Sequence, residues 1–194
     1  MTKFKYIFLL IISFSLTNCD TDDDGFYNTV YIDLDNIVTI EPHSTTYAVG
    51  EYLRIMADFS RFQNENGQQL DIFTTTGGAS EFNFSYVIER QASTDVWNVV
   101  TVLDSQLDID EGDAQNGSYV YGRCIYNSTS QSFKYNVGFP LLTAGTYRVR
   151  FGYNSENSTN VILRSNSAPG KLILDINSSI VGLNGGGYYN FTVN

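Results

Sequence analysis

The chain has 194 residues, which is enough for one sandwich-sized domain after an N-terminal leader. Tyr (14), Phe (13) and Gly (16) are frequent and only 16% of the residues are charged, a composition that favours strands joined by turns. The net charge of −10 argues against nucleic acid as a partner and against electrostatic binding to anionic lipids, because both need clustered Lys and Arg.

Residues 1–18 have the pattern of a secretory signal peptide. Lys3 and Lys5 give a positive start, and an apolar stretch of about eleven residues follows over 6–16. That stretch is too short to span a bilayer. Cleavage would remove both lysines and no acidic residue, so the charge of the remaining chain would be −12. Membrane attachment of such an acidic chain has to be covalent.

The leader ends in Leu16-Thr17-Asn18-Cys19, which resembles the cleavage site of a bacterial lipoprotein signal. The resemblance implies that Cys19 is lipidated and becomes the new N-terminus; the alternative is a plain secretory signal with an incidental Cys. The acidic run 20–24 stays extended and solvated, so residues 19–27 are predicted to be a tether. The run also resembles the export signal of Bacteroidota surface lipoproteins. This second resemblance implies lipid anchoring in the outer membrane with exposure at the cell surface.

Residues 28–194 are predicted to form a single all-β domain of about 8–10 strands. Leu53, Ile55, Ala57 and Phe59 share one face and alternate with Tyr52, Arg54, Met56 and Asp58, as a half-buried strand requires. Related patterns predict strands over 30–34, 37–40, 82–89, 96–103, 119–126, 133–139, 147–153, 161–163, 172–176 and 189–193. The polar stretches 61–78 and 104–117 are predicted to be long loops, and no segment has a convincing helical period.

The clearest strand follows the turn residue Gly145. One of its faces carries only apolar or aromatic side chains, namely Tyr147, Val149, Phe151 and Tyr153. Arg148 and Arg150 are predicted to point outward, because the opposite register would bury two guanidinium groups. The Gly-Thr-Tyr entry resembles the penultimate strand of immunoglobulin-like sandwiches, in which a Tyr ties back to the preceding corner. It implies an immunoglobulin-like antiparallel β-sandwich, with a jelly roll as the alternative because strand count does not fix topology.

Cys124 is the only cysteine besides Cys19. With Cys19 acylated, no intramolecular disulfide can form, so the fold has to be stabilised by packing alone. Cys124 lies in the middle of a predicted strand and is interpreted as a small buried apolar residue.

The acidic stretch 104–113 is the candidate metal site. Asp108, Asp110 and Asp113 offer hard oxygen ligands near Gly112, a combination that suits calcium. The stretch departs from the EF-hand pattern, because the glycine comes one place early and no closing Glu follows. The alternative is a solvated loop whose charges keep strand edges from pairing with other molecules.

Several aromatic residues are candidates for stacking against a sugar. Trp97, Tyr119 and Tyr121 are the main ones, with Tyr126 and a pair at Tyr188 and Tyr189 as further candidates. The alternative is ordinary packing, because Tyr is favoured on pleated surfaces. A ligand, if there is one, is expected to be a glycan or a protein at the cell surface.

Evidence for an enzyme is weak. His43, the only histidine, lies in a predicted turn and is interpreted as a surface residue. Paired carboxylates drawn from Glu51, Asp58, Glu81 and Glu89 could hydrolyse a glycoside, but any acidic protein offers such pairs. The sequence therefore favours a non-enzymatic binding or structural module without a cofactor. A glycan-binding accessory lipoprotein and a carboxylate-dependent glycoside hydrolase remain as alternatives.

The anchor assignment predicts the behaviour of Cys19→Ala. Without the acyl chains, the protein should move from the membrane fraction to the soluble fraction, because nothing else in the acidic chain binds lipid strongly. Membrane fractionation with immunoblotting measures this, with Cys124→Ala as the matched cysteine control that should stay on the membrane. A Cys19→Ala protein that pellets as firmly as the parent would disprove the assignment.

Overall fold

The computed structural model describes residues 29–65, 67–151, 159–166 and 171–194. The predicted signal peptide, Cys19 with the acidic tether, and Tyr153 lie outside the described residues. In the described ranges, no helix is long and apolar enough to cross a membrane.

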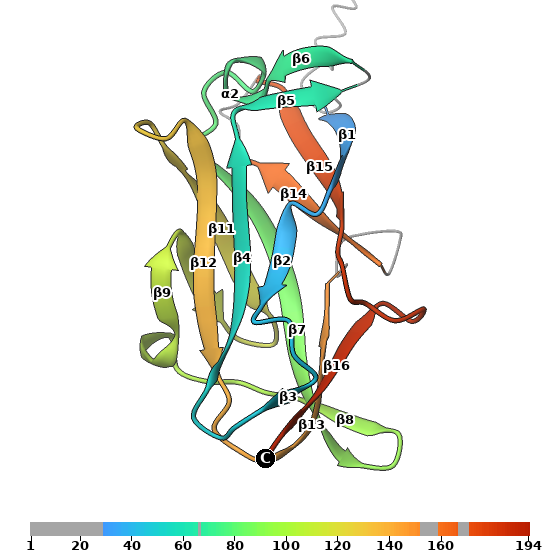
Figure 1. Cartoon of the computed structure of the whole chain (residues 1–194). Coiled ribbons are helices and arrows are strands. Elements are labelled where there is room, and N and C mark those ends of the chain that lie inside the picture. The colour runs from blue at the N-terminus through green and yellow to red at the C-terminus, as the bar shows by residue number, and fades with distance from the viewer. Residues whose placement is uncertain (1–28, 66, 152–158, 167–170) are drawn as a thin grey trace, which may run out of the picture.

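The domain is all-β, as predicted (Figure 1). Its elements are β1 Thr29–Asp35, β2 Val38–Glu41, β3 Thr46–Tyr47, β4 Tyr52–Ser60, β5 Phe62–Glu65, β6 Gln68–Asp71, α2 Ile72–Thr75, β7 Glu81–Ser93, β8 Val96–Val99, the 3₁₀ turn Asp104–Gln106, β9 Asp108–Glu111, β10 Asp113–Asn116, β11 Val120–Asn127, β12 Ser132–Pro140, β13 Gly145–Arg150, β14 Asn160–Ser165, β15 Ile173–Ser179 and β16 Tyr188–Val193. The stretch 61–78 is therefore not a plain loop, since it contains the β5–β6 hairpin and the single turn of α2.

The strand order is that of an immunoglobulin-like sandwich. A first layer runs β2-β4-β12-β11, and a second runs β7-β13-β16-β3 with β8 on the outer side of β7. These orders correspond to the ABED and CFG sheets of immunoglobulin-like domains, so they favour that prediction over the jelly roll. The hairpin of β14 and β15 extends the sheet beside β7, and β1 pairs parallel to β15.

Strand β7 belongs to both layers. Its residues 81–86 pair with β11, and residues 87–90 pair with β13. The hydrogen-bonded ladder is therefore continuous from one layer to the other, and the sheet curls around the core. The path also begins at β1 and ends at β2, which are separated in the chain only by Asn36 and Ile37, so the curl brings its two edges together.

The inward rows of the strands are those that alternation predicts. All members of four such rows are buried: Leu53, Ile55, Ala57 and Phe59 on β4; Phe82, Phe84, Tyr86 and Ile88 on β7; Phe133, Tyr135, Val137 and Phe139 on β12; and Tyr147, Val149 and Phe151 at β13. The Tyr147 hydroxyl donates to the Thr143 carbonyl at 2.7 Å, which is the predicted tie to the preceding corner. Cys124 is a free, buried cysteine whose burial raises the pKa of its thiol.

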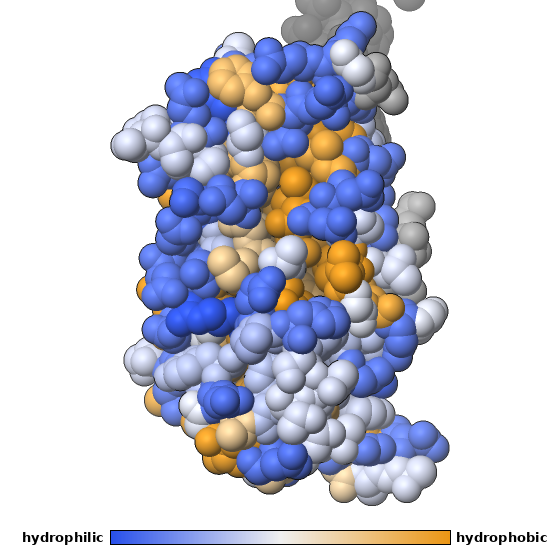
Figure 2. All heavy atoms as spheres, viewed as in Figure 1, coloured by the Kyte–Doolittle hydropathy of each residue, from blue (hydrophilic) through white to orange (hydrophobic). Residues whose placement is uncertain are grey.

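Figure 2 shows that the face over β9, β12 and β4 is mainly hydrophilic, while hydrophobic side chains reach the surface over β1, β2 and β15. Val30 of β1 and Val181 after β15 are among the exposed large hydrophobic residues. The hydrophilic face follows from the outward row of β4, where Arg54 and Asp58 alternate with the buried residues.

Replacing Phe151 tests the two faces of β13. Phe151 is buried with its ring 5.8 Å from that of Tyr86, so Phe151→Ala should lower the free energy of unfolding by about 3–5 kcal/mol through lost burial and a cavity. Arg150→Ala, on the opposite face, should cost about 1 kcal/mol or less. Denaturant melts of both variants and the parent measure the difference. A larger loss for Arg150→Ala would show that the outward face carries the stabilising contacts.

Candidate functional site

The acidic stretch 104–117 is part of the first layer instead of a loop. Strands β11 and β12 pair with each other only over residues 125–127 and 132–134, and then separate. The gap between them is filled by β9, which pairs with β12, and β10, which pairs with β11. The loop prediction was wrong because these four-residue strands are rich in Asp, Gln and Asn and lack the apolar row that identifies longer strands.

Gly112 makes this insertion possible. It lies where the chain passes from β9 to β10, with φ +77°. A Cβ atom there would lie 2.6 Å from the carbonyl oxygen of Arg123 and 2.9 Å from that of Lys134. The chain therefore lies directly against the backbones of β11 and β12, and only glycine fits both the conformation and the space.

The three aspartates of the predicted calcium site do not converge on one point. Asp108 and Asp110 both pair with Arg54, with 2.7 Å between Asp110 Oδ2 and Arg54 Nη1, whereas Asp113 pairs with Arg123. No group of three His, Cys, Asp or Glu side chains that could hold a metal ion occurs in the described part of the chain. In the structure the sheet instead presents each of these carboxylates to a cation on a neighbouring strand.

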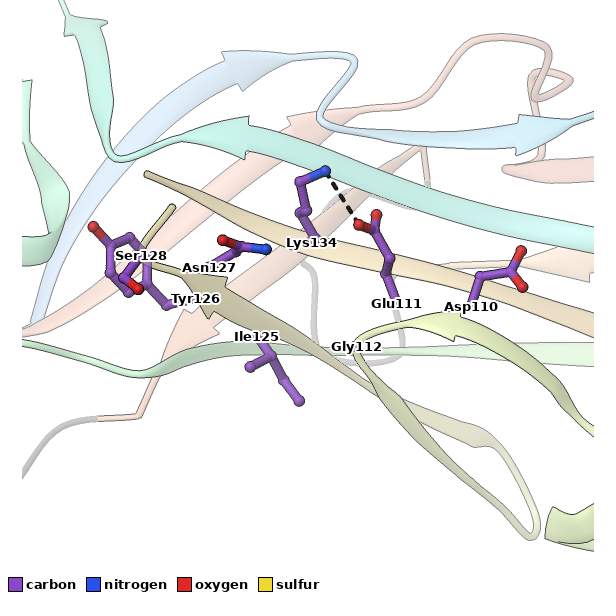
Figure 3. Close-up of a pocket in the computed structure, with 8 residues that line it drawn as sticks. All are labelled: Asp110, Glu111, Gly112, Ile125, Tyr126, Asn127, Ser128 and Lys134. Carbon is purple, nitrogen blue, oxygen red and sulfur yellow. Dashed lines mark hydrogen bonds and ion pairs between the residues drawn. The ribbon is translucent and has the colours of Figure 1, made fainter. Parts of the chain in front are cut away.

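A groove of about 510 Å³ opens beside the crossing at Gly112 (Figure 3). Its lining residues come from β9, β11, β12 and the turn after β11: Asp110, Glu111, Gly112, Ile125, Tyr126, Asn127, Ser128 and Lys134. We call it the Lys134 groove.

The centre of the Lys134 groove is charged. Lys134 Nζ lies 3.2 Å from Glu111 Oε1 and 3.4 Å from Asp58 Oδ2. The two side chains of the Lys134–Glu111 pair point toward each other in Figure 3. Hydrogen bonds to Glu111 and Asp58 raise the pKa of the Lys134 amine, so the ammonium form is retained. The groove thus presents a fixed donor next to fixed acceptors.

Tyr126 lines one end of the groove, and its ring lies on the side of the sheet that carries the buried Phe133. That ring stacks on Phe73 with 4.4 Å between centroids and leans on the buried Phe133 at 5.0 Å. The Arg61 guanidinium lies 5.1 Å from the Phe73 ring centre and pairs with Asp71, lowering the pKa of that carboxyl group to about 2. Contacts from β5, β6 and α2 therefore fix the aromatic end of the groove.

The remaining lining is neutral. Ile125 is 40% exposed and supplies apolar surface on β11. Asn127 Oδ1 accepts hydrogen bonds from the backbone N–H groups of Thr129 and Ser130 at 2.9 and 3.2 Å, which fixes the turn that carries Ser128. The groove therefore combines an aliphatic side chain with charged and neutral hydrogen-bonding groups.

The predicted ligand-binding aromatics do not form one site. Trp97 lies on β8, and the Arg148 guanidinium is 4.2 Å from the centre of its ring and 4.1 Å from that of Tyr188. Arg148 also donates to Glu89 at 2.7 Å, so Trp97 and Tyr188 take part in a cation–π cluster on the second layer.

Tyr119 and Tyr121 lie away from that cluster. Tyr119 directly precedes β11 and is 37% exposed, and Tyr121 lies within β11 and is 36% exposed. Partial burial and the nearby Glu81 raise the pKa of Tyr121. Tyr189 is a core residue. Of the further aromatic candidates, only Tyr126 lines the Lys134 groove.

The carboxylates considered for hydrolysis are dispersed. Glu51 accepts from the Ala48 N–H at 2.7 Å, Asp58 lies near Lys134, Glu81 is 3.9 Å from Arg123, and Glu89 binds Arg148. His43 is exposed, as expected, and its ring packs edge-on against Tyr189 at 5.2 Å.

Sequence reasoning missed Lys134, Glu111 and Asn127 as site residues. Lys134 is a cation at an outward position in an acidic chain, and this is the only signal the sequence offers for it. Its partners come from β4 and β9, so the site can be recognised only once the order of strands in the sheet is known.

No model of a known protein family matches the sequence, and no curated protein is significantly similar to it.

Gly112 can be tested against a second glycine of similar conformation. Gly67 has φ +81° but open space around a would-be Cβ, whereas Gly112 has φ +77° and two close carbonyl oxygens. Backbone strain is common to both alanine variants, so Gly112→Ala should be destabilised by roughly 1–3 kcal/mol more than Gly67→Ala because of overpacking. Denaturant melts measure this difference. Equal losses would mean that β9 and β10 do not lie against β11 and β12 as described.

Proposed function

We propose that this protein is a lipid-anchored cell-surface binding module without catalytic activity, and that its ligand is a glycan segment held in the Lys134 groove. The observation that carries the proposal is the combination within one groove of the exposed Ile125 side chain and the Lys134–Glu111 pair, which lie on the same face of the sheet. Ligand sites of this kind are concave, with a few placed polar groups that fix orientation.

The chemistry of the groove suits a sugar. A sugar ring has a C–H face that packs on aromatic or aliphatic surface, and a rim of hydroxyl groups that both donate and accept hydrogen bonds. Ile125 offers the apolar surface, Lys134 offers a donor, and Glu111 offers an acceptor. Lys134 and Glu111 already hold each other before any ligand binds, which reduces the entropy lost on binding.

The absence of catalysis is supported by the placement of the carboxylates. Glycoside hydrolysis needs two of them on either side of one bond, one acting as the acid. Glu51, Asp58, Glu81 and Glu89 are instead held by four different partners on different parts of the sandwich. Glu111 in the groove is engaged by Lys134.

The anchor is supported by the leader and by charge. The lipoprotein-like signal ending at Cys19 and the acidic run after it favour an outer-membrane lipoprotein exposed at the cell surface. An acidic domain is repelled by anionic head groups, so it would stand away from the membrane on its tether with the groove open to solvent.

A glycan array probed with the detergent-purified full chain tests the proposal. At least one class of glycan should bind, and Lys134→Met should weaken that binding roughly ten-fold or more, because a charge-assisted hydrogen bond is lost. Lys171→Met, which removes an exposed lysine elsewhere, is the matched control and should bind like the parent.

The bound glycan should also remain intact during incubation, as measured by reducing-end release. Release of reducing ends that disappears in Glu111→Gln or Asp58→Asn would establish a hydrolase instead. An array without any bound glycan would refute the glycan ligand and leave a structural or protein-binding role.

A further inference from the structure

The cations of this acidic chain are almost all paired with carboxylates. Seven of the nine Lys and Arg residues in the described ranges form an ion pair, namely Arg54, Arg61, Arg123, Lys134, Arg148, Arg150 and Arg164. Lys171 is exposed and has none with the described residues. Arg90 also has none, although its side chain is partly buried.

Arg90 occupies a position that the strand pattern assigns to the interior. Along β7, residues 82, 84, 86 and 88 point into the core and are almost completely buried. Period two places Arg90 in the same row, opposite Tyr147 of β13 and Asn98 of β8. The inward row of β7 therefore extends beyond the core at position 90, at the end of the sandwich where β8 lies (Figure 1).

A pocket of about 290 Å³ lies at this end of the row. It is lined by Arg90, Ala92, Asn98, Val99, Val100, Thr101, Thr143 and Tyr147. Asn98, Thr101 and Thr143 offer amide and hydroxyl groups, the valines and the Tyr147 ring offer apolar surface, and no carboxylate lines the pocket. We call it the Arg90 pocket.

The aliphatic stem of Arg90 is fixed while its charged group is not engaged. A Cβ atom on Gly145 would lie 3.4 Å from Arg90 Cδ and 3.5 Å from Cγ, so the stem packs against the backbone of β13. Its guanidinium forms no hydrogen bond or ion pair with any described residue. Capping the core with the stem explains the packing, but an apolar or uncharged residue would cap it equally well. Packing of the stem does not explain why a guanidinium is present at a position where no carboxylate pairs with it.

We propose that the Arg90 pocket binds the carboxylate group of a small ligand. A guanidinium binds a carboxylate through two parallel N–H···O bonds, and the neutral amide and hydroxyl groups around it can complete the recognition. A phosphate dianion suits the pocket less well, because only one cation lines it and the chain as a whole carries −10.

The volume of the Arg90 pocket limits the ligand to about one sugar ring or one amino-acid residue. The carboxylate could therefore belong to an acidic sugar or to the free end of a peptide. This site lies apart from the Lys134 groove, since the two share no lining residue. The inference does not depend on the proposed glycan ligand of that groove.

Titration calorimetry and ligand-observed NMR on the detergent-purified full chain test the proposal, with glucuronate and N-acetylglycine as carboxylate probes and glucose as the neutral control. Saturable binding of at least one carboxylate probe, and weaker or no binding of glucose, are expected. Arg90→Met keeps an unbranched stem over Gly145 and removes the charge, so carboxylate affinity should fall roughly ten-fold or more. Lys171→Met removes the same charge from a lysine whose stem lies over Gly77, and should leave affinity unchanged.

Binding of glucuronate alone would identify an acidic sugar as the source of the carboxylate, and binding of N-acetylglycine alone would identify a peptide end. Binding of both would support a general carboxylate site. The proposal is overturned if neither probe binds, if glucose binds as well as glucuronate, or if Arg90→Met binds like the parent. Lys134→Met should leave carboxylate binding intact. Failure of the Arg90 proposal is therefore distinguishable from failure of the glycan proposal for the Lys134 groove.

Discussion

The structure depends on β7 being shared by the two layers. Both ends of this 13-residue strand are paired, and Ser85, Val87 and Glu89 on its outward row are buried as well as the inward row. A carboxylate buried in this way needs a cation beside it. Arg148 on the adjacent β13 meets that need at 2.7 Å, and its guanidinium then lies near the rings of Trp97 and Tyr188. One shared strand thus determines where the only tryptophan lies.

Alternation in the sequence predicted the inward rows, because period two is a local property of each strand. The corner formed by Tyr147 was expected from the resemblance of its Gly-Thr-Tyr entry to immunoglobulin-like strands, and the burial of Cys124 from its place in the middle of a predicted strand. Alternation could not predict that β9 and β10 fill the gap between β11 and β12, since that pairing depends on contacts distant in the sequence. The same limit explains the candidate sites. Lys134 meets Glu111 and Asp58 only across strands, and Trp97 looked available for a ligand because Arg148 is 51 positions away.

Ion pairs also determine how the charged side chains are arranged on the outer face of the first layer. Arg54, Arg123 and Lys134 each lie between two carboxylates, so three cations form ion pairs with six acidic groups. Individual exposed pairs of this kind contribute little stability. Their main effect is to fix side-chain positions and to keep short strands such as β9 from pairing with other molecules. The surplus of acidic groups makes a cation without a carboxylate informative, which is why Arg90 is better explained by a ligand than by chance.

The two proposed sites differ in how firmly the sheet holds them. Strands β11 and β12, which line the Lys134 groove, are paired on both sides, and Lys134 is held by Glu111, so a ligand would meet preformed geometry. The Arg90 pocket is bounded by β8, whose pairing with β7 shifts register between Gln91 and Ser93, and by residues 100 and 101 after it. The hydrogen-bonded ladder of that wall is therefore interrupted. A carboxylate bridging Arg90 to the neutral groups opposite would therefore order this end of the sandwich, while binding in the groove would change the structure little.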